Sequence, residues 1–220
     1  MSRSVQDSPR IPRLLAISDR RSLPPEMPFD AWLRLLADAQ RRTGTPLAVQ
    51  IREKDLDDRR LLELVRASRE TLPAEVPVLV NGRPDVALAA GADGVHRPAA
   101  GLPVAEVRRR AGKAGRPLRV GRSTHSRDEV EAAHDEGADY VTVGPVHPTP
   151  SKAAYGPPPG LGGLAEAVRA GGPPVIALGG VTPDRLPPLA AAGAHGAAAI
   201  RAFQDAASAL AMMRGTEVFR

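Results

Sequence analysis

The chain has 220 residues, of which 42% are hydrophobic and none is cysteine. This size and composition predict one domain with a sizeable core, without disulfides or thiolate metal sites. The net charge is +5, but only 3% of the residues are aromatic and no zinc-binding or basic-zipper pattern occurs, which argues against a nucleic-acid partner. No apolar run reaches membrane-spanning length, and residues 1–12 lack a hydrophobic signal core, so we expect a cytoplasmic protein without a membrane partner.

Short apolar runs alternate with amphipathic stretches along the chain, as in repeated strand–helix units. Eight such units predict an α/β fold, a single (β/α)8 TIM barrel over residues 13–213, with a disordered basic tail at 1–12 and a C-terminal tail at 214–220. A doubly wound parallel sheet is the alternative. The predicted strands are 14–17, 47–51, 76–80, 94–96, 118–120, 140–143, 175–178 and 197–200. The predicted helices are 29–42, 57–72, 83–90, 103–113, 127–136, 161–170, 183–192 and 202–213.

Three junctions between a predicted helix and the next strand share a glycine-led pattern. Glycine there suits a left-handed helix cap, so the aspartates in these junctions are predicted to be turn residues, away from any active site. The junctions are Gly91-Ala92-Asp93-Gly94, Gly137-Ala138-Asp139-Tyr140 and Gly193-Ala194-His195-Gly196.

Polar residues that suit helix capping stand where three of the helices are predicted to begin. Asp57 and Thr182 are predicted to be N-caps, and Ser126 with Glu129 is predicted to form a capping box.

Polar segments follow four of the predicted strands, at the end of a barrel where active sites form. After the second strand, period-two alternation places Gln50, Arg52 and Lys54 on one side, and three such donors aimed together would be costly in a core without an anion. We expect these segments to donate to a phosphate or diphosphate, and a solvated loop is the alternative for each. The other three polar segments after predicted strands are Asn81-Gly82-Arg83, Gly121-Arg122-Ser123-Thr124-His125 and the run from Gly144 to Lys152.

The run from Gly144 to Lys152 contains three prolines, which limit the freedom that a loop loses when it closes on an anion. Lysine is otherwise scarce and occurs only at Lys54, Lys113 and Lys152. A compact ammonium differs from a planar guanidinium, so Lys54 and Lys152 are candidates for a task that arginine does not perform.

The last two strands end differently. Gly179-Gly180 precedes a helix, and Ile200-Arg201 opens the final helix. Loops at these places often bind phosphate through backbone N–H groups at a helix N-terminus. For Arg201, a surface position at the start of its helix is the alternative.

Three of the five histidines, His96, His125 and His147, follow predicted strands. His125 is the best candidate for proton transfer, because imidazole titrates near neutral pH and suits both acid and base roles. A hydrogen-bonding role without proton transfer is the alternative. The histidine spacing matches no metal motif.

Several ordered motifs between residues 14 and 203 together resemble one family, thiamine phosphate synthase and its relative, thiazole tautomerase. The resemblance implies a barrel that binds two phosphorylated half-molecules, a pyrimidine diphosphate and a thiazole phosphate. In the synthase the pyrimidine loses its diphosphate, and the thiazole nitrogen attacks the resulting carbocation. The motifs are Gln50-Ile51-Arg52-Glu53-Lys54-Asp55, Val80-Asn81-Gly82-Arg83, Gly91 to His96, Ser123-Thr124-His125, Gly137 to Tyr140, Gly144 to Lys152, and Gly179-Gly180.

The resemblance also implies roles for individual residues. His125 and Lys152 would be catalytic, and Lys152 would also hold the diphosphate. The pyrimidine diphosphate would further be held by Gln50, Arg52, Lys54, Asn81 and Ser123. The thiazole phosphate would be held by Thr149, Ser151, Gly180, Ile200 and Arg201.

The chain departs from the synthase pattern where magnesium is expected. The two magnesium-binding aspartates would follow the third and fourth strands, but Gly82 stands at the first place, and the second, near Gly101, holds no carboxylate. Magnesium prefers hard oxygen ligands, so magnesium as a cofactor is doubtful and no metal ligand is assigned. Arg97, Arg122 and Arg201 are alternatives for offsetting the diphosphate charge.

Three interpretations of the function remain at this point. The first is a thiamine phosphate synthase, a transferase, favoured by the retained diphosphate donors. The second is a thiazole tautomerase, an isomerase that shuttles a proton through His125, favoured by the missing magnesium ligands and by the run Leu15 to Asp19. The third is a non-catalytic binder of phosphorylated ligands. A homo-oligomer stays open in all three.

Overall fold

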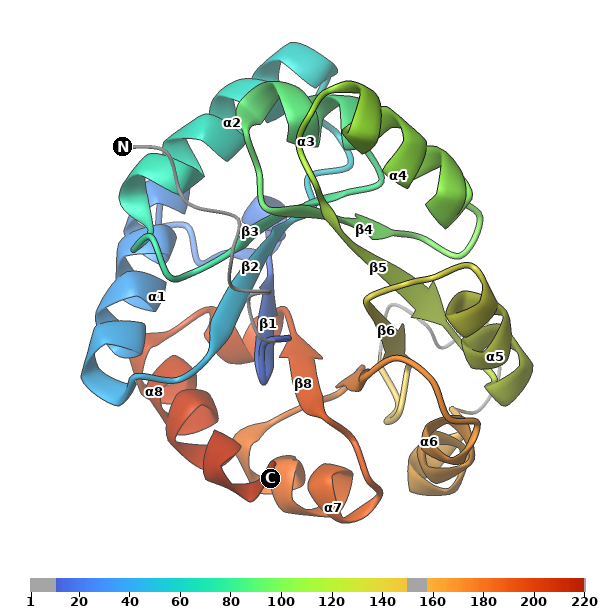
Figure 1. Cartoon of the computed structure of the whole chain (residues 1–220). Coiled ribbons are helices and arrows are strands. Elements are labelled where there is room, and N and C mark those ends of the chain that lie inside the picture. The colour runs from blue at the N-terminus through green and yellow to red at the C-terminus, as the bar shows by residue number, and fades with distance from the viewer. Residues whose placement is uncertain (1–10, 150–157, 220) are drawn as a thin grey trace.

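A computed structural model of the chain describes residues 11–149 and 158–219. In this part of the chain eight parallel strands form a closed barrel in sequential order, and the helices form a ring outside it (Figure 1). The strands are β1 (Leu14–Ile17), β2 (Leu47–Ile51), β3 (Val78–Asn81), β4 (Gly94–Arg97), β5 (Arg119–Thr124), β6 (Tyr140–Val143), β7 (Val175–Leu178) and β8 (Gly196–Ala199). The helices are α1 (Phe29–Thr43), α2 (Asp58–Thr71), α3 (Pro84–Ala90), α4 (Val104–Lys113), α5 (Arg127–Asp135), α6 (Gly160–Arg169), α7 (Leu186–Ala191) and α8 (Ala206–Arg214).

The predicted TIM barrel is therefore confirmed, and the doubly wound alternative is wrong. Leu14 of β1 lies opposite Ala197 of β8, so the last strand pairs with the first and leaves no open edge. Two predicted helices begin with a separate 3-10 turn. These turns are Pro183–Arg185 before α7 and Arg201–Phe203 before α8.

The core consists of two hydrophobic clusters separated by the barrel wall. Alternate strand residues point inward and fill the barrel, while the others pack against the helices. The interior cluster consists of Leu15, Ile17, Ala48, Leu79, Tyr140, Ile176 and Ala198. Leu14, Ala16, Val49 and Val80, which alternate with these residues, belong to the larger outer cluster that includes Trp32 of α1.

The glycine-led junctions have the predicted turn chemistry. Gly91, Gly137 and Gly193 have φ values of 71°, 78° and 90°, which lie in the left-handed region that favours glycine. The Asp93 carboxylate accepts a hydrogen bond from Val78 N at 2.8 Å, and that of Asp139 accepts one from Val120 N at 2.6 Å. These aspartates thus fasten the amino ends of neighbouring strands.

The predicted helix caps are only partly confirmed. Asp57 caps α2 by accepting from Arg60 N at 2.9 Å, and Ser126 caps α5 by accepting from Glu129 N at 3.3 Å. The Glu129 carboxylate accepts from His125 N at 2.7 Å. Thr182 stands at the N-cap position of the 3-10 turn before α7, as predicted, but its side chain makes no capping hydrogen bond.

Residues within both predicted tails contact the barrel. Ile11 packs against the interior cluster, whereas residues 1–10 lie outside the described part of the chain. At the other end, Gly215–Val218 forms a 3-10 helix, and Phe219 is only 6% exposed. Thr216 and Phe219, which the sequence assigns to a C-terminal tail, are therefore buried against the fold.

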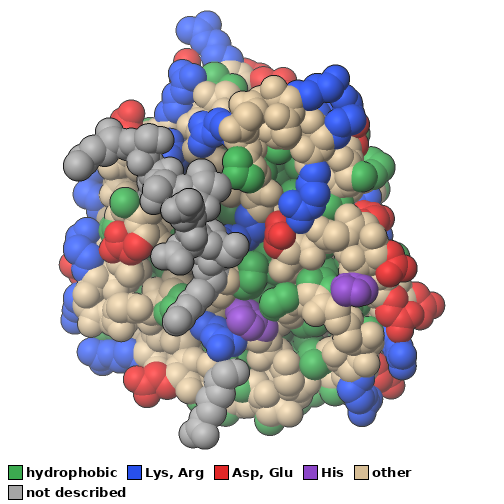
Figure 2. Space-filling model, in the orientation of Figure 1, with side chains coloured by type: hydrophobic (Ala, Val, Ile, Leu, Met, Phe, Trp, Pro, Cys, Tyr) green, Lys and Arg blue, Asp and Glu red, His purple; other side chains and the backbone are tan. Residues whose placement is uncertain are grey.

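Basic and acidic side chains are interspersed over the surface in Figure 2, which accords with the modest net charge. Many of these arginines pair with an acid one helical turn away, as Arg34 does with Asp30 and Arg127 does with Glu131. In the described part of the chain, no helix is both long and apolar enough to cross a bilayer.

Candidate active site

Five inward-facing polar residues line one side of the barrel mouth at the carboxyl ends of β2 to β6, and neighbouring members are joined by a side-chain hydrogen bond or by sheet pairing. Gln50 donates through Nε2 to Asn81 Oδ1 at 2.9 Å, and Asn81 lies opposite His96 in the sheet. The His96 imidazole contacts Ser123 Oγ at 2.9 Å and Thr142 Oγ1 at 3.4 Å, both through Nε2. We call Gln50, Asn81, His96, Ser123 and Thr142 the polar arc. It places three of the predicted substrate ligands in one chain of contacts.

The opposite side of the barrel mouth is apolar. Ile17 belongs to the interior cluster, and Leu178 and Ile200 pack against it from the ends of β7 and β8. The mouth therefore has one polar and one apolar half, which suits a ligand with a flat organic ring and polar substituents. Because the Ile200 side chain is used in packing, only its backbone is suited to contact a phosphate.

His96 is the one imidazole of the polar arc, and it is only 3% exposed. Its Nδ1 contacts the hydroxyl of Tyr140 at 2.9 Å. Burial lowers the pKa of the His96 imidazole to about 3, and the Arg52 guanidinium acts in the same direction. The imidazole is therefore neutral at physiological pH and serves as a hydrogen-bonding group rather than a cation.

The three donors predicted after the second strand lie progressively farther from the core. Gln50 is buried, Arg52 is half-buried and Lys54 is exposed on the turn after β2. Arg52 is close enough to His96 to affect its pKa, so its guanidinium lies near the polar arc. Gln50 Oε1 is buried without a hydrogen-bond partner, which leaves an acceptor that a bound ligand can satisfy.

The turn after β7 is built from two glycines that neighbouring backbone segments confine. Gly179 and Gly180 have φ values of 102° and 62°, and a Cβ on Gly180 would lie 2.7 Å from His147 Cβ. His147 N donates to Gly179 O at 3.1 Å, so the loop after β6 lies directly against this turn. The side chain of Arg185 donates to Gly180 O at 2.6 Å. This packing fixes the backbone where the sequence predicts a phosphate site.

The other predicted site residues are less fully described. Thr149 is half-buried after β6, and Arg201 is exposed in the 3-10 turn after β8, while Ser151 and Lys152 lie outside the described residues. The His125 side chain is 45% exposed, and its Nδ1 lies 3.2 Å from Glu129 Oε2 on α5. His125 is therefore not part of the polar arc.

Two arginines suggested as diphosphate partners point away from the mouth. Arg97 and Arg122 alternate with the inward-facing His96 and Ser123, so they lie on the outer side of the barrel wall. There both pair with Glu136, at 3.8 Å and 2.9 Å. The suggestion that they offset the charge of a diphosphate in the mouth is wrong.

The described residues do not provide the magnesium ligands that the resemblance implies. Gly82 and Gly101 stand at the expected places, and Asp85 is exposed on α3. Within residues 11–149 and 158–219, no three His, Cys, Asp or Glu side chains are grouped so that they could hold a metal ion. The polar arc offers amide, imidazole and hydroxyl groups, whereas magnesium prefers carboxylate and water oxygens. This donor set therefore does not fit magnesium.

The sequence alone indicates no role for Thr142, Ser18 or Glu53, and it favours His125 over His96 for proton transfer. Period-two alternation could have identified His96, because Gly94 and His96 stand two residues apart in β4 and therefore face the same side of the strand. The burial of Glu53, at 5% exposure, could not have been inferred, because its partner Ser18 is 35 residues away in sequence.

Comparisons with known proteins show which family the chain resembles in sequence. The family model described as thiamine monophosphate synthase matches residues 17–203. A Geobacter sulfurreducens relative is 50% identical over 160 residues, covering 72% of this chain and 74% of that protein. The thiamine-phosphate synthase of Anaeromyxobacter dehalogenans is 45% identical over 164 residues, covering 74% and 72%.

Among solved structures, the thiamine phosphate pyrophosphorylase from Pyrococcus furiosus superposes with a TM-score of 0.79 at 30% identity, covering 94% of this chain and 97% of that one. A 4-hydroxy-2-oxoglutarate aldolase/2-deydro-3-deoxyphosphogluconate aldolase, at 22% identity and a TM-score of 0.62, shares the fold alone. The extent of the family match and the identity to its relatives show that the chain belongs to the thiamine monophosphate synthase family.

Proposed function

We propose that this protein joins a hydroxymethylpyrimidine diphosphate to a thiazole phosphate, forming thiamine phosphate and releasing diphosphate. The observation that carries the proposal is the polar arc facing an apolar half-mouth in a barrel of this family. The unpartnered Gln50 Oε1 supplies an acceptor for a ring substituent of the pyrimidine.

In this proposal Arg52 and Ser123 bind the diphosphate at the rim of the polar arc, together with Lys54, Asn81 and Lys152. Cationic and hydroxyl donors stabilise the negative charge that builds on the leaving diphosphate as the carbon–oxygen bond breaks. The neutral His96 imidazole keeps Ser123 Oγ oriented without adding a charge of its own. The side chain of Lys152 assists the departure as a cation near the leaving oxygens.

The thiazole phosphate is assigned to the opposite rim. Backbone N–H groups of Gly180, Ile200 and Arg201 bind its phosphate, with help from the Thr149 and Ser151 hydroxyls. The confined Gly179–Gly180 turn supports this assignment, because a preorganised backbone loses little entropy when the anion binds. A cytoplasmic location is part of the same proposal.

A direct assay tests the proposed reaction. Purified protein is incubated with both half-molecules, once with magnesium and once with a chelator, and thiamine phosphate is measured by chromatography. We expect product in at least one condition and a loss of about a hundredfold or more in kcat/KM for Ser123→Ala, the range for removing one transition-state donor. The absence of product in both conditions would refute the proposal.

No observation in the structure favours tautomerisation as a second function. That reaction would require His125 to face the bound thiazole, whereas its ring is exposed and paired with Glu129. We therefore expect the His125→Ala variant to make thiamine phosphate at the wild-type rate, which would place His125 outside the reaction. The same substitution abolishing turnover while thiazole phosphate still binds would restore the proton-transfer hypothesis.

A further inference from the structure

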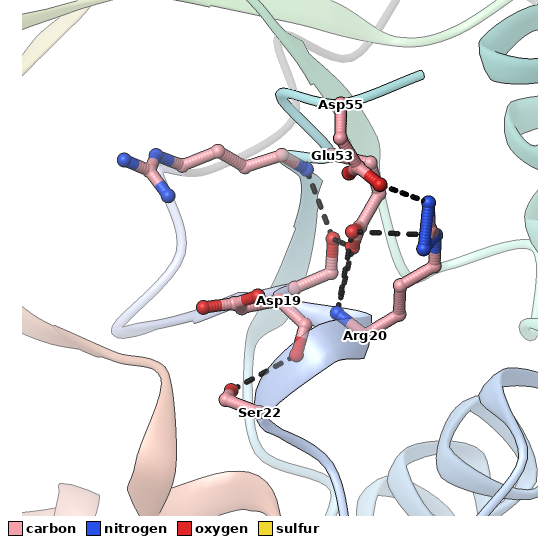
Figure 3. Close-up of polar contacts among 7 residues, drawn as sticks. Asp19, Arg20, Ser22, Glu53 and Asp55 are labelled. Carbon is pink, nitrogen blue, oxygen red and sulfur yellow. Dashed lines mark hydrogen bonds and ion pairs between the residues drawn. The ribbon is translucent and has the colours of Figure 1, made fainter.

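A buried carboxylate lies directly behind the residues that face the proposed diphosphate. Glu53 follows β2, between Arg52 and Lys54, and is 5% exposed. Figure 3 shows that Glu53 and Asp55 both face the guanidinium of Arg20, in the loop after β1. Neither the polar arc nor the proposed reaction uses this carboxylate.

Glu53 has a nearly complete set of partners. Its Oε1 accepts from Ser18 Oγ at 2.6 Å, and both carboxylate oxygens lie 3.2 Å from Arg20 N. The Arg20 guanidinium adds an ion pair at 3.8 Å. Burial raises the pKa of the Glu53 carboxyl, although the bonds from Ser18 and Arg20 oppose that shift. The fold thus keeps a charge in a place where burial disfavours it.

Ser18 connects this carboxylate to the backbone of Arg52. Its hydroxyl donates its proton to Glu53 and accepts a hydrogen bond from Arg52 N at 2.9 Å. Because a hydroxyl has only one proton, the bond to Glu53 leaves its lone pairs directed at Arg52 N. The backbone of Ser18 is itself held by a bond from its N–H to Gln50 O at 2.9 Å. The loop after β1 and the end of β2 therefore form one rigid unit beneath the Arg52 side chain.

The charge balance of this unit leaves Arg52 available to a ligand. Arg20 forms ion pairs with both Glu53 and Asp55. Arg20 is therefore neutralised by its own acids and does not compete with Arg52 for an incoming anion. The charge of Arg52 acts instead on the polar arc, where it lowers the pKa of His96.

We propose that Glu53 is a positioning residue, which acts through Ser18 to hold the Arg52 backbone so that the guanidinium is preset for the diphosphate. This inference rests on the proposed function and adds to it a residue that touches neither substrate. A side chain of this kind affects the binding of one substrate only, because the thiazole phosphate is assigned to the opposite rim. A purely structural carboxylate would instead lower stability and impair both substrates alike.

The test compares Glu53→Ala with Asp55→Ala, since each removes one carboxylate beside Arg20 and only the first removes the acceptor of the Ser18 hydroxyl. We expect Glu53→Ala to raise the KM for the pyrimidine diphosphate about tenfold, a size typical of losing an outer partner of a ligand. Calorimetry with inorganic diphosphate should show its Kd raised by a similar factor. The KM for thiazole phosphate should stay within about twofold, and Asp55→Ala should change both KM values and the diphosphate Kd by less than about twofold.

A second variant keeps the test decisive if Glu53→Ala folds poorly. Ser18→Ala removes the connection while leaving the pair between Glu53 and Arg20, and it should raise the same two constants. The double variant should show no greater effect than the stronger single variant, because both changes break one connection.

Three outcomes would overturn the inference: equal effects of Glu53→Ala and Asp55→Ala, parallel rises in both KM values, or an unchanged diphosphate Kd in Ser18→Ala. Failure of the wild-type protein to make product or to bind diphosphate would instead refute the proposed function itself.

Discussion

His96 shows how a single buried side chain can organise a site without being charged. It contacts Tyr140 on one nitrogen and Ser123 on the other, so both ring nitrogens are occupied. Burial raises the pKa of the Tyr140 hydroxyl and lowers that of His96, so both groups are neutral at physiological pH. The polar arc therefore presents hydrogen bonds of defined direction, while the cationic charge comes from Arg52 at its rim.

This state of His96 predicts a particular pH dependence of stability. The unfolded chain binds a proton at His96 below about pH 6.5, whereas the folded chain does so only near pH 3, so the free energy of unfolding falls as the pH drops between these values. The slope from this group is about 1.4 kcal/mol per pH unit. Urea unfolding at pH 7.0, 5.5 and 4.5 should show a shallower acid loss in His96→Gln than in the wild type.

The difference between variant and wild type is the quantity to compare, because Glu53 and the other titrating groups contribute equally to both. Parallel stability curves over this range would contradict the assignment of His96 as a buried neutral base.

At the scale of elements, the cap of α2 holds the helix that follows the Arg52 segment. Asp57 accepts from Arg60 N at 2.9 Å, and it stands at the end of the turn that carries Lys54. Asp57→Ala should lower the free energy of unfolding by about 1 kcal/mol, the usual cost of a lost N-cap. Asp57→Asn keeps the acceptor and should lose less than half as much in the same urea titration. Equal losses in both variants would assign the effect to charge rather than to capping.

Most of the elements could be predicted from local patterns. Most strands are short apolar runs bounded by glycine or polar turns, and the helices are amphipathic stretches with a period of about 3.6 residues. Gly91, Gly137 and Gly193 could be assigned locally for the same reason, since a left-handed cap depends on one residue. Arg97 and Arg122 could not, because the direction of a side chain depends on which residue of its strand first points inward. The role of Glu53 depends on Ser18 in another loop, and no local pattern records that contact.

At the scale of the whole molecule, the two ends of the barrel have separate tasks. The carboxyl ends of the strands carry the polar arc, whereas the amino ends are fastened by Asp93, Asp139 and the C-terminal segment. A cavity of about 500 Å³ at the amino end is lined by Arg13, Thr45, Phe219 and neighbouring residues. In a barrel of this kind, residues at that end are expected to affect stability more than catalysis.

Phe219 provides a test of this separation. Its ring is 6% exposed and belongs to the outer cluster, so Phe219→Ala should lower the free energy of unfolding by about 3 kcal/mol. Val218→Ala is the matched control, because Val218 is 37% exposed and should lose less than about 1 kcal/mol. At a temperature where both variants are folded, kcat and both KM values should stay within about twofold of the wild type, since no part of the polar arc contacts this end. A large change in either KM for folded Phe219→Ala would show that the two ends are coupled through the barrel interior, which would contradict the division of tasks.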